Sequence, residues 1–126
     1  MTEFTIRLAN RPGMLAELAQ LLGQAGVNIE ALAAFGHGED GQVRLIVDDA
    51  DSTRRAFRGA GIALDERQVI TTILPDRPGE LAKMTRDLAD GGVNIDAMYL
   101  LNSHADGREF AVAVTDGDLA HQRLAG

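Results

Sequence analysis

Hydrophobic residues follow two different spacings along the first part of the chain. Between residues 4 and 8, apolar side chains alternate with polar ones, which is typical of a half-buried strand. The pattern breaks at Pro12-Gly13, because proline lacks an N–H and favours a turn or the first helical position. Apolar residues then recur at spacings of three and four, the stripe of an amphipathic helix, at Leu15, Leu18, Leu22 and Ala25. Gly26 supplies the helix stop.

The following residues predict a hairpin, a short helix and a final strand. The segments VNIEALAAF (27–35) and QVRLIVD (42–48) are typical of two strands joined by a glycine-rich loop. Asp51 is a suitable cap for a short helix, and Ile62-Ala63-Leu64 is expected to begin the last strand. The order β-α-β-β-α-β is that of the split βαβ, or ferredoxin-like, unit. This unit belongs to the α+β class and has an antiparallel sheet with both helices on one face.

One phrase of the sequence occurs twice. RPGMLAELAQLLGQAGVNI runs from Arg11 to Ile29 and RPGELAKMTRDLADGGVNI from Arg77 to Ile95, so both ends are offset by 66 residues. A repeat of this length suits a very small domain better than a solenoid unit. The sequence therefore predicts two ferredoxin-like βαββαβ domains, residues 1–68 and residues 69–126. The second copy stops after its second helix and lacks the last strand.

Each predicted domain is too small to be strongly stable alone. A unit of about 60 residues buries only about 60% of its unfolded surface, and a missing strand leaves a sheet edge open to pairing. The first helix carries Met14 and Leu21 where the second has Glu80 and Asp87, so its apolar arc is wider. We therefore predict a homodimer, with these extra apolar positions facing a partner.

Composition and charge exclude several classes of function. The 126 residues carry a net charge of −7 and no cysteine, which excludes a disulfide and a cysteine-based metal site. A negative chain with few aromatic residues does not suit nucleic acid, including the RNA-recognition use of this fold. The sequence shows no basic leader and no apolar stretch of membrane-spanning length. We expect a cytoplasmic protein with neither nucleic acid nor membrane as a partner.

Patterns that could indicate a cofactor, a metal or catalysis are better explained by local structure. GHGEDG, from Gly36 to Gly41, matches the dinucleotide fingerprint, but a predicted strand follows where that motif needs a helix. No histidine has a second histidine three or four residues later, and the acidic clusters precede short helices that they can cap. No nucleophile or acid–base constellation is present. We expect no cofactor, no metal and no enzymatic activity.

The remaining candidate for a ligand-binding site is the turn between the first strand and the first helix. This turn occurs at Pro12-Gly13 and again at Pro78-Gly79. The first N–H groups of a helix are unpaired, and the helix dipole favours an anion there. The amide of Asn28 or Asn94, at the start of the next strand, can both donate and accept. This combination suits a zwitterion such as a free amino acid. The alternative is that Pro-Gly only shapes the turn and that the asparagine only caps the helix end.

Both copies resemble the ACT domain, whose pattern is roughly Asp-x-Pro-Gly, then Leu, a helix, and Gly-x-Asn-Ile. The first copy matches at 10–15 and 26–29, the second at 76–81 and 92–95. The resemblance implies a regulatory module that binds amino acids at interfaces between paired domains. By this resemblance the ligand-binding residues are Asn10, Arg11, Gly13, Met14, Asn28 and Ile29 in the first copy, and Asp76, Arg77, Gly79, Glu80, Leu81, Asn94 and Ile95 in the second.

The resemblance further implies a free-standing tandem ACT protein that senses an amino acid and acts on a separate protein partner. A structural or interaction module without a ligand is the alternative. The copies differ at one site position, where the first has Asn10 and the second Asp76. A carboxylate pairs with a ligand ammonium group better than an amide does. We therefore predict that the turn at 76–79, together with Asn94, is the better amino-acid site.

Overall fold

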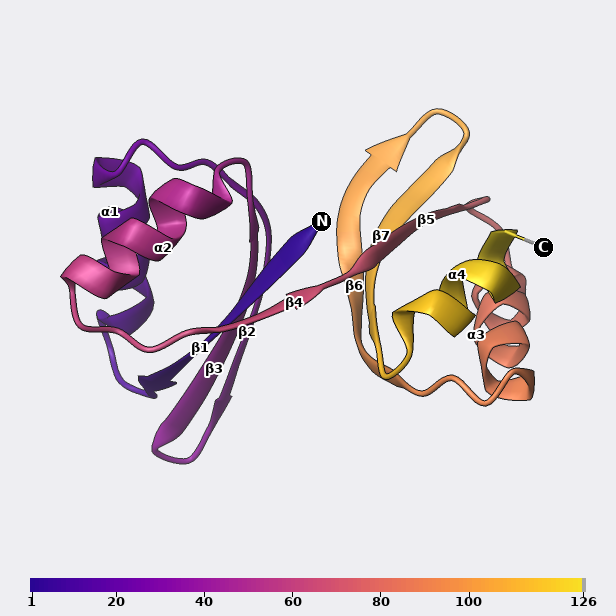
Figure 1. The fold of residues 1–126 in the computed structure, drawn as a ribbon, viewed down its shortest axis with the longest axis horizontal. Coiled ribbons are helices and arrows are strands. Elements are labelled where there is room, and N and C mark those ends of the chain that lie inside the picture. The colour runs from indigo at the N-terminus through magenta and orange to yellow at the C-terminus, as the bar shows by residue number, and fades with distance from the viewer. Residues whose placement is uncertain (126) are drawn as a thin grey trace. The chain divides into compact units, whose positions relative to one another are not determined.

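The structure is a computed structural model that describes residues 1–125, so Gly126, the end of the second predicted domain, lies outside the described residues. The chain forms two compact units, one of Thr2–Arg67 and one of Met1 with the chain from Gln68 onward. Each unit holds one sheet and two helices (Figure 1). The predicted α+β class with two ferredoxin-like units is confirmed.

The first unit follows the predicted order of strands and helices. Its elements are β1 (Thr2–Ala9), α1 (Met14–Gln24), β2 (Ile29–His37), β3 (Asp40–Val47), α2 (Ala50–Gly59) and β4 (Asp65–Gln68). The strands lie in the order β2-β3-β1-β4, and β3 is antiparallel to both β1 and β2. Both helices cover one face of this sheet (Figure 1). The core between helices and sheet consists of Phe4, Ile6, Leu18, Leu22, Val27, Val43, Leu45 and Phe57.

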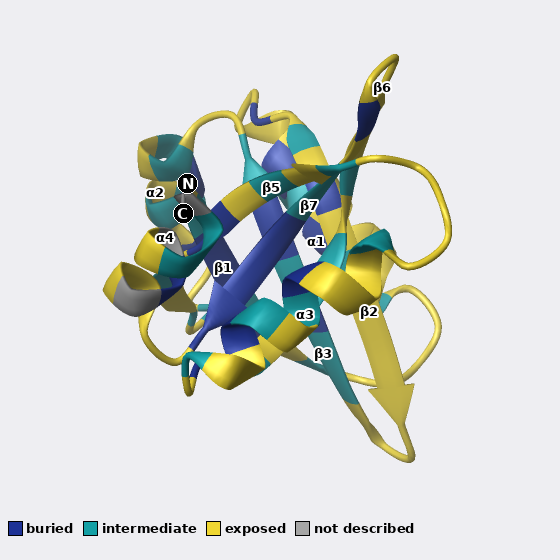
Figure 2. Ribbon diagram, turned by 90° about the vertical axis from the view of Figure 1, so that its right-hand side faces the viewer, coloured by how far each residue is buried: buried dark blue, intermediate teal, exposed yellow. Residues whose placement is uncertain are grey.

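Helix α1 lies between two glycines in the left-handed conformation, as the sequence predicts. Gly13, at its N-cap, has φ 90°, and Gly26, just beyond its C-cap, has φ 75°. Leu18 and Leu22 are buried, but Leu15, predicted on the same stripe, is 41% exposed. The reason is that Leu15 lies in the first turn of α1, beside the edge strand β2, which is exposed along most of its length (Figure 2).

Two predicted boundaries in the first unit are wrong. The cap of α2 is Asp49 rather than Asp51, because the Asp49 carboxylate accepts the Ser52 N–H at 3.0 Å. The predicted strand start at Ile62 is instead the exit of α2, where the Ile62 N–H donates to the carbonyl of Phe57 at 2.9 Å. Ile62 packs against the core, and β4 begins only at residue 65. Ile62 and Leu64, the alternating apolar residues of this segment, pack against the core although they do not belong to a strand.

The second unit repeats this plan without a last strand. Its elements are β5 (Ile70–Leu74), α3 (Glu80–Asp90), β6 (Ile95–His104), β7 (Gly107–Val114) and α4 (Gly117–Ala125). The strand order is β5-β7-β6, with β7 antiparallel to both neighbours. Its core consists of Ile70, Met84, Leu88, Val93, Val112, Val114 and Ala120. In the described chain no strand follows α4, so β5 stays at the edge of its sheet.

The two units differ by one inserted residue in the long hairpin. Leu45 pairs with Phe4 in the first unit, and Val112 pairs with Ile70 in the second. The offset is therefore 66 between β1 and β5 (70 − 4) but 67 between β3 and β7 (112 − 45). A register shift within β6 accommodates the extra residue. The constant offset read from the repeated phrase thus holds only as far as β6.

Candidate functional site

The turn that follows β1 leaves the first N–H groups of α1 open. Gly13 has φ 90° and ψ −15° at the N-cap, and no side chain caps the helix. The N–H groups of Leu15 and Ala16 have no acceptor among residues 1–125. The turn after β5 has the same shape, with Gly79 at φ 89° and ψ −13°, and leaves the two equivalent N–H groups open. Each turn can therefore bind an anion such as a carboxylate.

Asn10 fastens the first turn to the hairpin between β2 and β3. Its side-chain amide donates to the carbonyl of Gly38 at 2.9 Å, and its backbone N–H donates to the carbonyl of Glu39 at 2.8 Å. A Cβ at Gly36 would lie only 2.7 Å from the Asn10 amide, so any other residue there would push this side chain aside. The predicted ligand residue Asn10 thus has a structural contact as well. Its side-chain oxygen has no donor among the described residues.

Ion pairs occupy the charged side chains of the second turn. Asp76 pairs with Arg108 of β7 at 3.3 Å. Arg77 donates to Glu80 at 2.6 Å, and Lys83 lies 3.5 Å from the same carboxylate oxygen. The hydrogen bond from Arg77 holds the pKa of Glu80 below its usual range, so this carboxylate is ionised at neutral pH. A ligand ammonium would have to compete with Arg108 for Asp76.

The first turn lacks the equivalent ion pairs. Met14 stands where the second copy has Glu80, so Arg11 has no carboxylate partner within the described chain and its side chain is exposed. A free guanidinium beside open N–H groups strengthens the attraction of the turn for a carboxylate. The first turn is therefore expected to bind an anionic group better than the second. The second turn is more acidic, because it carries Asp76 and Glu80.

Asn28 lies at the opposite end of the sheet from the first turn. The strand β1 ends at Ala9, which pairs with Asp40, whereas β2 begins at Ile29, which pairs with Val47. The two pairs are seven residue steps apart along β3, and at about 3.4 Å per step this is roughly 24 Å. The sequence-based expectation that turn and asparagine adjoin is wrong within one unit. The same register separates Asn94 from the second turn.

The asparagines and isoleucines at the strand starts have local structural contacts. Asn28 N–H donates to Asp48 at 2.9 Å, just before α2, and Asn94 N–H donates to the Thr115 hydroxyl at 3.3 Å, just before α4. Ile29 and Ile95 pack against the cores of their units. The side-chain amide of Asn94 also donates to Asp96 at 3.0 Å. The Asn28 side chain has no such bond to any described residue, so its amide is the freer of the two.

A hollow of about 160 Å³ adjoins the first turn. Its lining combines the polar Asn10 and Arg11 with apolar side chains from β1, α1, β2 and β3, which are Leu8, Met14, Leu15, Ala34, Phe35 and Val43. A hollow beside the second turn is polar instead, with Asp76, Arg77, Ser103, His104, Asp106 and Arg108 in its lining. The two turns share a backbone shape but present different surroundings to a ligand.

Sequence reasoning missed the hairpin residues that complete these hollows. Ala34 and Phe35 precede the glycine-rich loop of the first hairpin, and Arg108 follows the tip of the second. Phe35 is 59% exposed, which is unusual for phenylalanine. An aromatic residue directly before a glycine-rich turn was the available signal, but only the strand register brings it beside the first turn.

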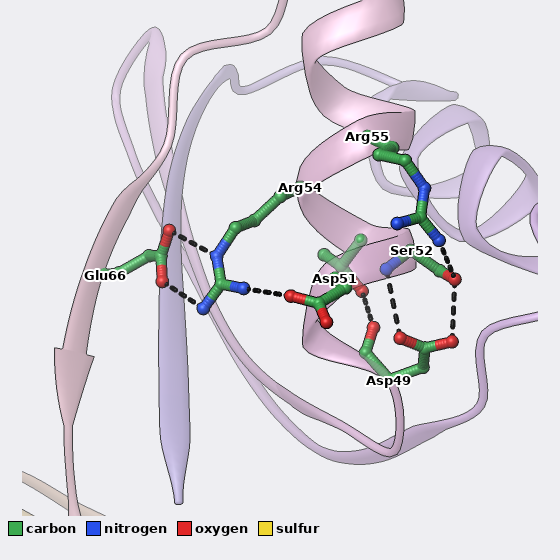
Figure 3. Close-up of polar contacts among 7 residues, drawn as sticks. Asp49, Asp51, Ser52, Arg54, Arg55 and Glu66 are labelled. Carbon is green, nitrogen blue, oxygen red and sulfur yellow. Dashed lines mark hydrogen bonds and ion pairs between the residues drawn. The ribbon is translucent and has the colours of Figure 1, made fainter.

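The basic residues of α2 belong to a separate polar cluster (Figure 3). Arg54 holds both carboxylate oxygens of Glu66 at 2.7 and 2.8 Å, and Asp51 at 2.6 Å. The hydrogen bonds from Arg54 lower the pKa of Glu66. The side-chain and backbone hydrogen bonds of Ser52 likewise lower the pKa of Asp49, the cap of the helix. This cluster fastens β4 to α2 and explains the basic spot without a ligand.

Metal-ligand clusters and membrane-spanning helices are both absent from the described residues. In the part of the chain that the structure covers, no three His, Asp or Glu side chains gather as a metal site. None of its helices is long and apolar enough to cross a membrane. GHGEDG lies at the hairpin tip, with Gly41 within β3 rather than at a helix start, so the dinucleotide interpretation fails.

The repeated turn phrase has a counterpart in a known family. Residues 2–57 match the ACT domain. The chain carries an ACT domain. This match confirms the family resemblance seen in the Pro-Gly turn and the Gly-x-Asn-Ile phrase. No match was found among curated proteins.

Solved structures are similar to the chain over both units. Protein BT0572 from Bacteroides thetaiotaomicron is 27% identical, with a TM-score of 0.89 over 98% of this chain and 85% of that one. The regulatory subunits of aspartate kinase from Thermus thermophilus and Thermus flavus are each 18% identical, with TM-scores of 0.72 and 0.68. The matches cover 98% of this chain and 87% and 90% of theirs. At 18% identity, the likeness of these two subunits to this chain shows a shared fold alone.

Proposed function

We propose that this ACT-domain protein binds a free amino acid, or a similar small zwitterion, and regulates a separate protein. The observation that carries the proposal is the pair of matching turns, each with two open N–H groups at a helix start. The helix dipole and these donors favour the ligand carboxylate. The shared fold with regulatory subunits of aspartate kinase supports a regulatory role rather than a catalytic one.

The proposed site requires a second unit, which we propose belongs to another copy of the chain. A turn and the asparagine of the same unit lie at opposite ends of the sheet, so one small ligand cannot contact both. If Asn28 of another copy met the ligand on the first turn, binding would stabilise the dimer. A partner protein could then respond to the change in assembly, because a ligand shifts an equilibrium toward the state that it binds better.

Thermal unfolding of the full chain with each of the twenty common amino acids tests this proposal. A ligand that binds only the folded state at about 100 times its Kd stabilises it by about 2.7 kcal/mol. For a chain of this size that corresponds to a rise in Tm of several degrees. We expect such a rise with a subset of the amino acids. No rise with any of them at 10 mM would contradict amino-acid binding.

A structural module without a ligand is the second candidate, and one observation favours it. Asn10 and Asp76, both predicted ligand residues, already tie their turns to the neighbouring hairpins. In this case the turns would only hold the hairpins in place, and assembly of the protein would not depend on amino acids. Light scattering with and without the amino acids separates the candidates, since only the first predicts a ligand-dependent molar mass.

A further inference from the structure

The first hollow has the size and lining of a site for one apolar side chain. Its volume is about 160 Å³, and most of its lining is apolar. A cavity of about 150 Å³ lined by Leu, Ile and Phe is enough to bind benzene. The polar side chains of the lining are Asn10, Arg11 and Gln42, and Asn10 and Arg11 belong to the turn that leaves the first N–H groups of α1 open. A ligand whose carboxylate meets this turn would place its side chain among the apolar residues.

The second unit carries different residues at the positions that line this hollow. Ala34 pairs with Val43 across the first hairpin, and at the equivalent positions Leu100 pairs with Phe110. Both replacements are larger, and the hollow beside the second turn, of about 360 Å³, is lined mainly by polar residues instead. Met14 is replaced by Glu80, whose carboxylate holds Arg77 at 2.6 Å. The apolar space is therefore a property of the first unit and does not follow from the shared fold.

We propose that the first unit selects free amino acids with an apolar side chain, which the hollow between α1 and the end of β2 accommodates. This inference rests on the proposed amino-acid binding and adds the class of ligand. Charged side chains are disfavoured because the apolar part of the lining offers them no partner and desolvates them. Glycine gains only the contacts of the turn, since it has no side chain to bury.

Calorimetry on the full chain tests the inference with L-leucine, L-methionine and L-phenylalanine against glycine, L-aspartate and L-lysine. We expect at least one apolar amino acid to bind tenfold or more tightly than glycine and both charged ones. The variant Ala34→Leu introduces the residue of the second unit and fills the hollow, so it should weaken that binding at least tenfold. Ala34→Ser, of nearly the same volume, is the matched control and should stay within about threefold.

The outcomes distinguish failure of the apolar selectivity from failure of the proposed amino-acid binding. Equal binding of apolar, charged and side-chain-free amino acids would overturn the selectivity but leave amino-acid binding intact. Tight apolar binding that Ala34→Leu does not weaken would place the ligand elsewhere and overturn the site. If Ala34→Leu does not fold, Met14→Glu, which introduces the residue of the second unit, puts a charge in the lining and should cause the same tenfold loss. Binding of none of the six would count against both proposals.

Discussion

Gly13 and Gly79 give the turns their shape through the backbone alone. Both have φ near 90°, and a Cβ at either position would meet no atom within 4 Å. Substitution by alanine therefore adds strain without a clash. We expect Gly13→Ala to lower the free energy of unfolding by about 1–2 kcal/mol, the cost of a left-handed non-glycine residue.

Urea denaturation of Gly13→Ala measures this cost, with Gly23→Ala as the control. Gly23 lies inside α1, where an added Cβ also meets nothing within 4 Å, and alanine there should raise stability by about 0.5–1 kcal/mol. Equal effects of the two substitutions would show that the left-handed turn conformation is not populated in solution.

The acidic residue of the second turn decides whether that turn can also hold an ammonium group. Asp76 pairs with Arg108, so a ligand must displace this guanidinium. Losing a hydrogen bond to a charged group costs roughly 1.5–3 kcal/mol, about ten- to a hundredfold in affinity. If the second turn binds as predicted, Asp76→Asn should weaken binding by that factor, and Arg108→Gln should strengthen it.

Calorimetry in the Ala34→Leu background measures the second turn alone, because the first hollow is then filled. The variant Asn10→Ala should have no effect on the second turn in that background. Unchanged affinity in Asp76→Asn would show that Asp76 does not contact the ligand. Its role would then be limited to the ion pair with Arg108.

At the scale of elements, the tie between α2 and β4 should make stability depend on pH. The pKa of Glu66 is lowered in the folded state by its hydrogen bonds to Arg54. Its contribution is therefore fully present above the unfolded pKa of about 4.3 and lost as the pH falls through the lower folded value. Glu66→Gln should lower Tm at pH 7 but leave it nearly unchanged at pH 3.

Thermal unfolding at both pH values checks this prediction against Glu30→Gln. Glu30 is an exposed residue of β2 without an ion pair to any described residue, so its substitution should not reproduce the pH-dependent difference. A Tm difference between wild type and Glu66→Gln that persists at pH 3 would show that the variant acts through packing rather than charge.

Most elements could be predicted from the sequence because their signals are local. The alternation in β1, the leucine spacing of α1 and the stop at Gly26 each depend on nearby residues. The start of β4 could not be predicted, because Ile62 packs on the core from an irregular segment. The turn residues of the site were also predictable, whereas the separation of Asn28 from the turn follows only from strand register.

At the scale of the whole molecule, association stays a prediction, as does the domain boundary after residue 68. Leu21, predicted to face a partner, packs instead against the core of its own unit. In the first unit, the exposed large apolar residues lie at the edge strand β2 and the start of α1, where Leu15 and Leu32 are each 41% exposed and Phe35 is 59% exposed. We therefore expect dimerisation through this edge.

Light scattering at tens of micromolar should show at least a dimer for the wild type. Leu32→Lys places a charge on the open edge of β2, a change that blocks edge pairing in natural sheets, and should shift the protein toward monomer. Thr71→Lys, on the edge strand β5 of the second unit, is the control and should keep the wild-type mass. A monomeric wild type would contradict the proposed assembly.

The central claim is that the open N–H groups at the start of α1 receive the carboxylate of a free amino acid. The most direct test is a titration of the ¹⁵N-labelled full chain with L-leucine, observed through its backbone amide resonances. The account predicts the largest shifts at Leu15 and Ala16, with smaller ones along Ala34 and Phe35, and their loss in Ala34→Leu. Saturable binding that leaves the Leu15 and Ala16 resonances unmoved would contradict it.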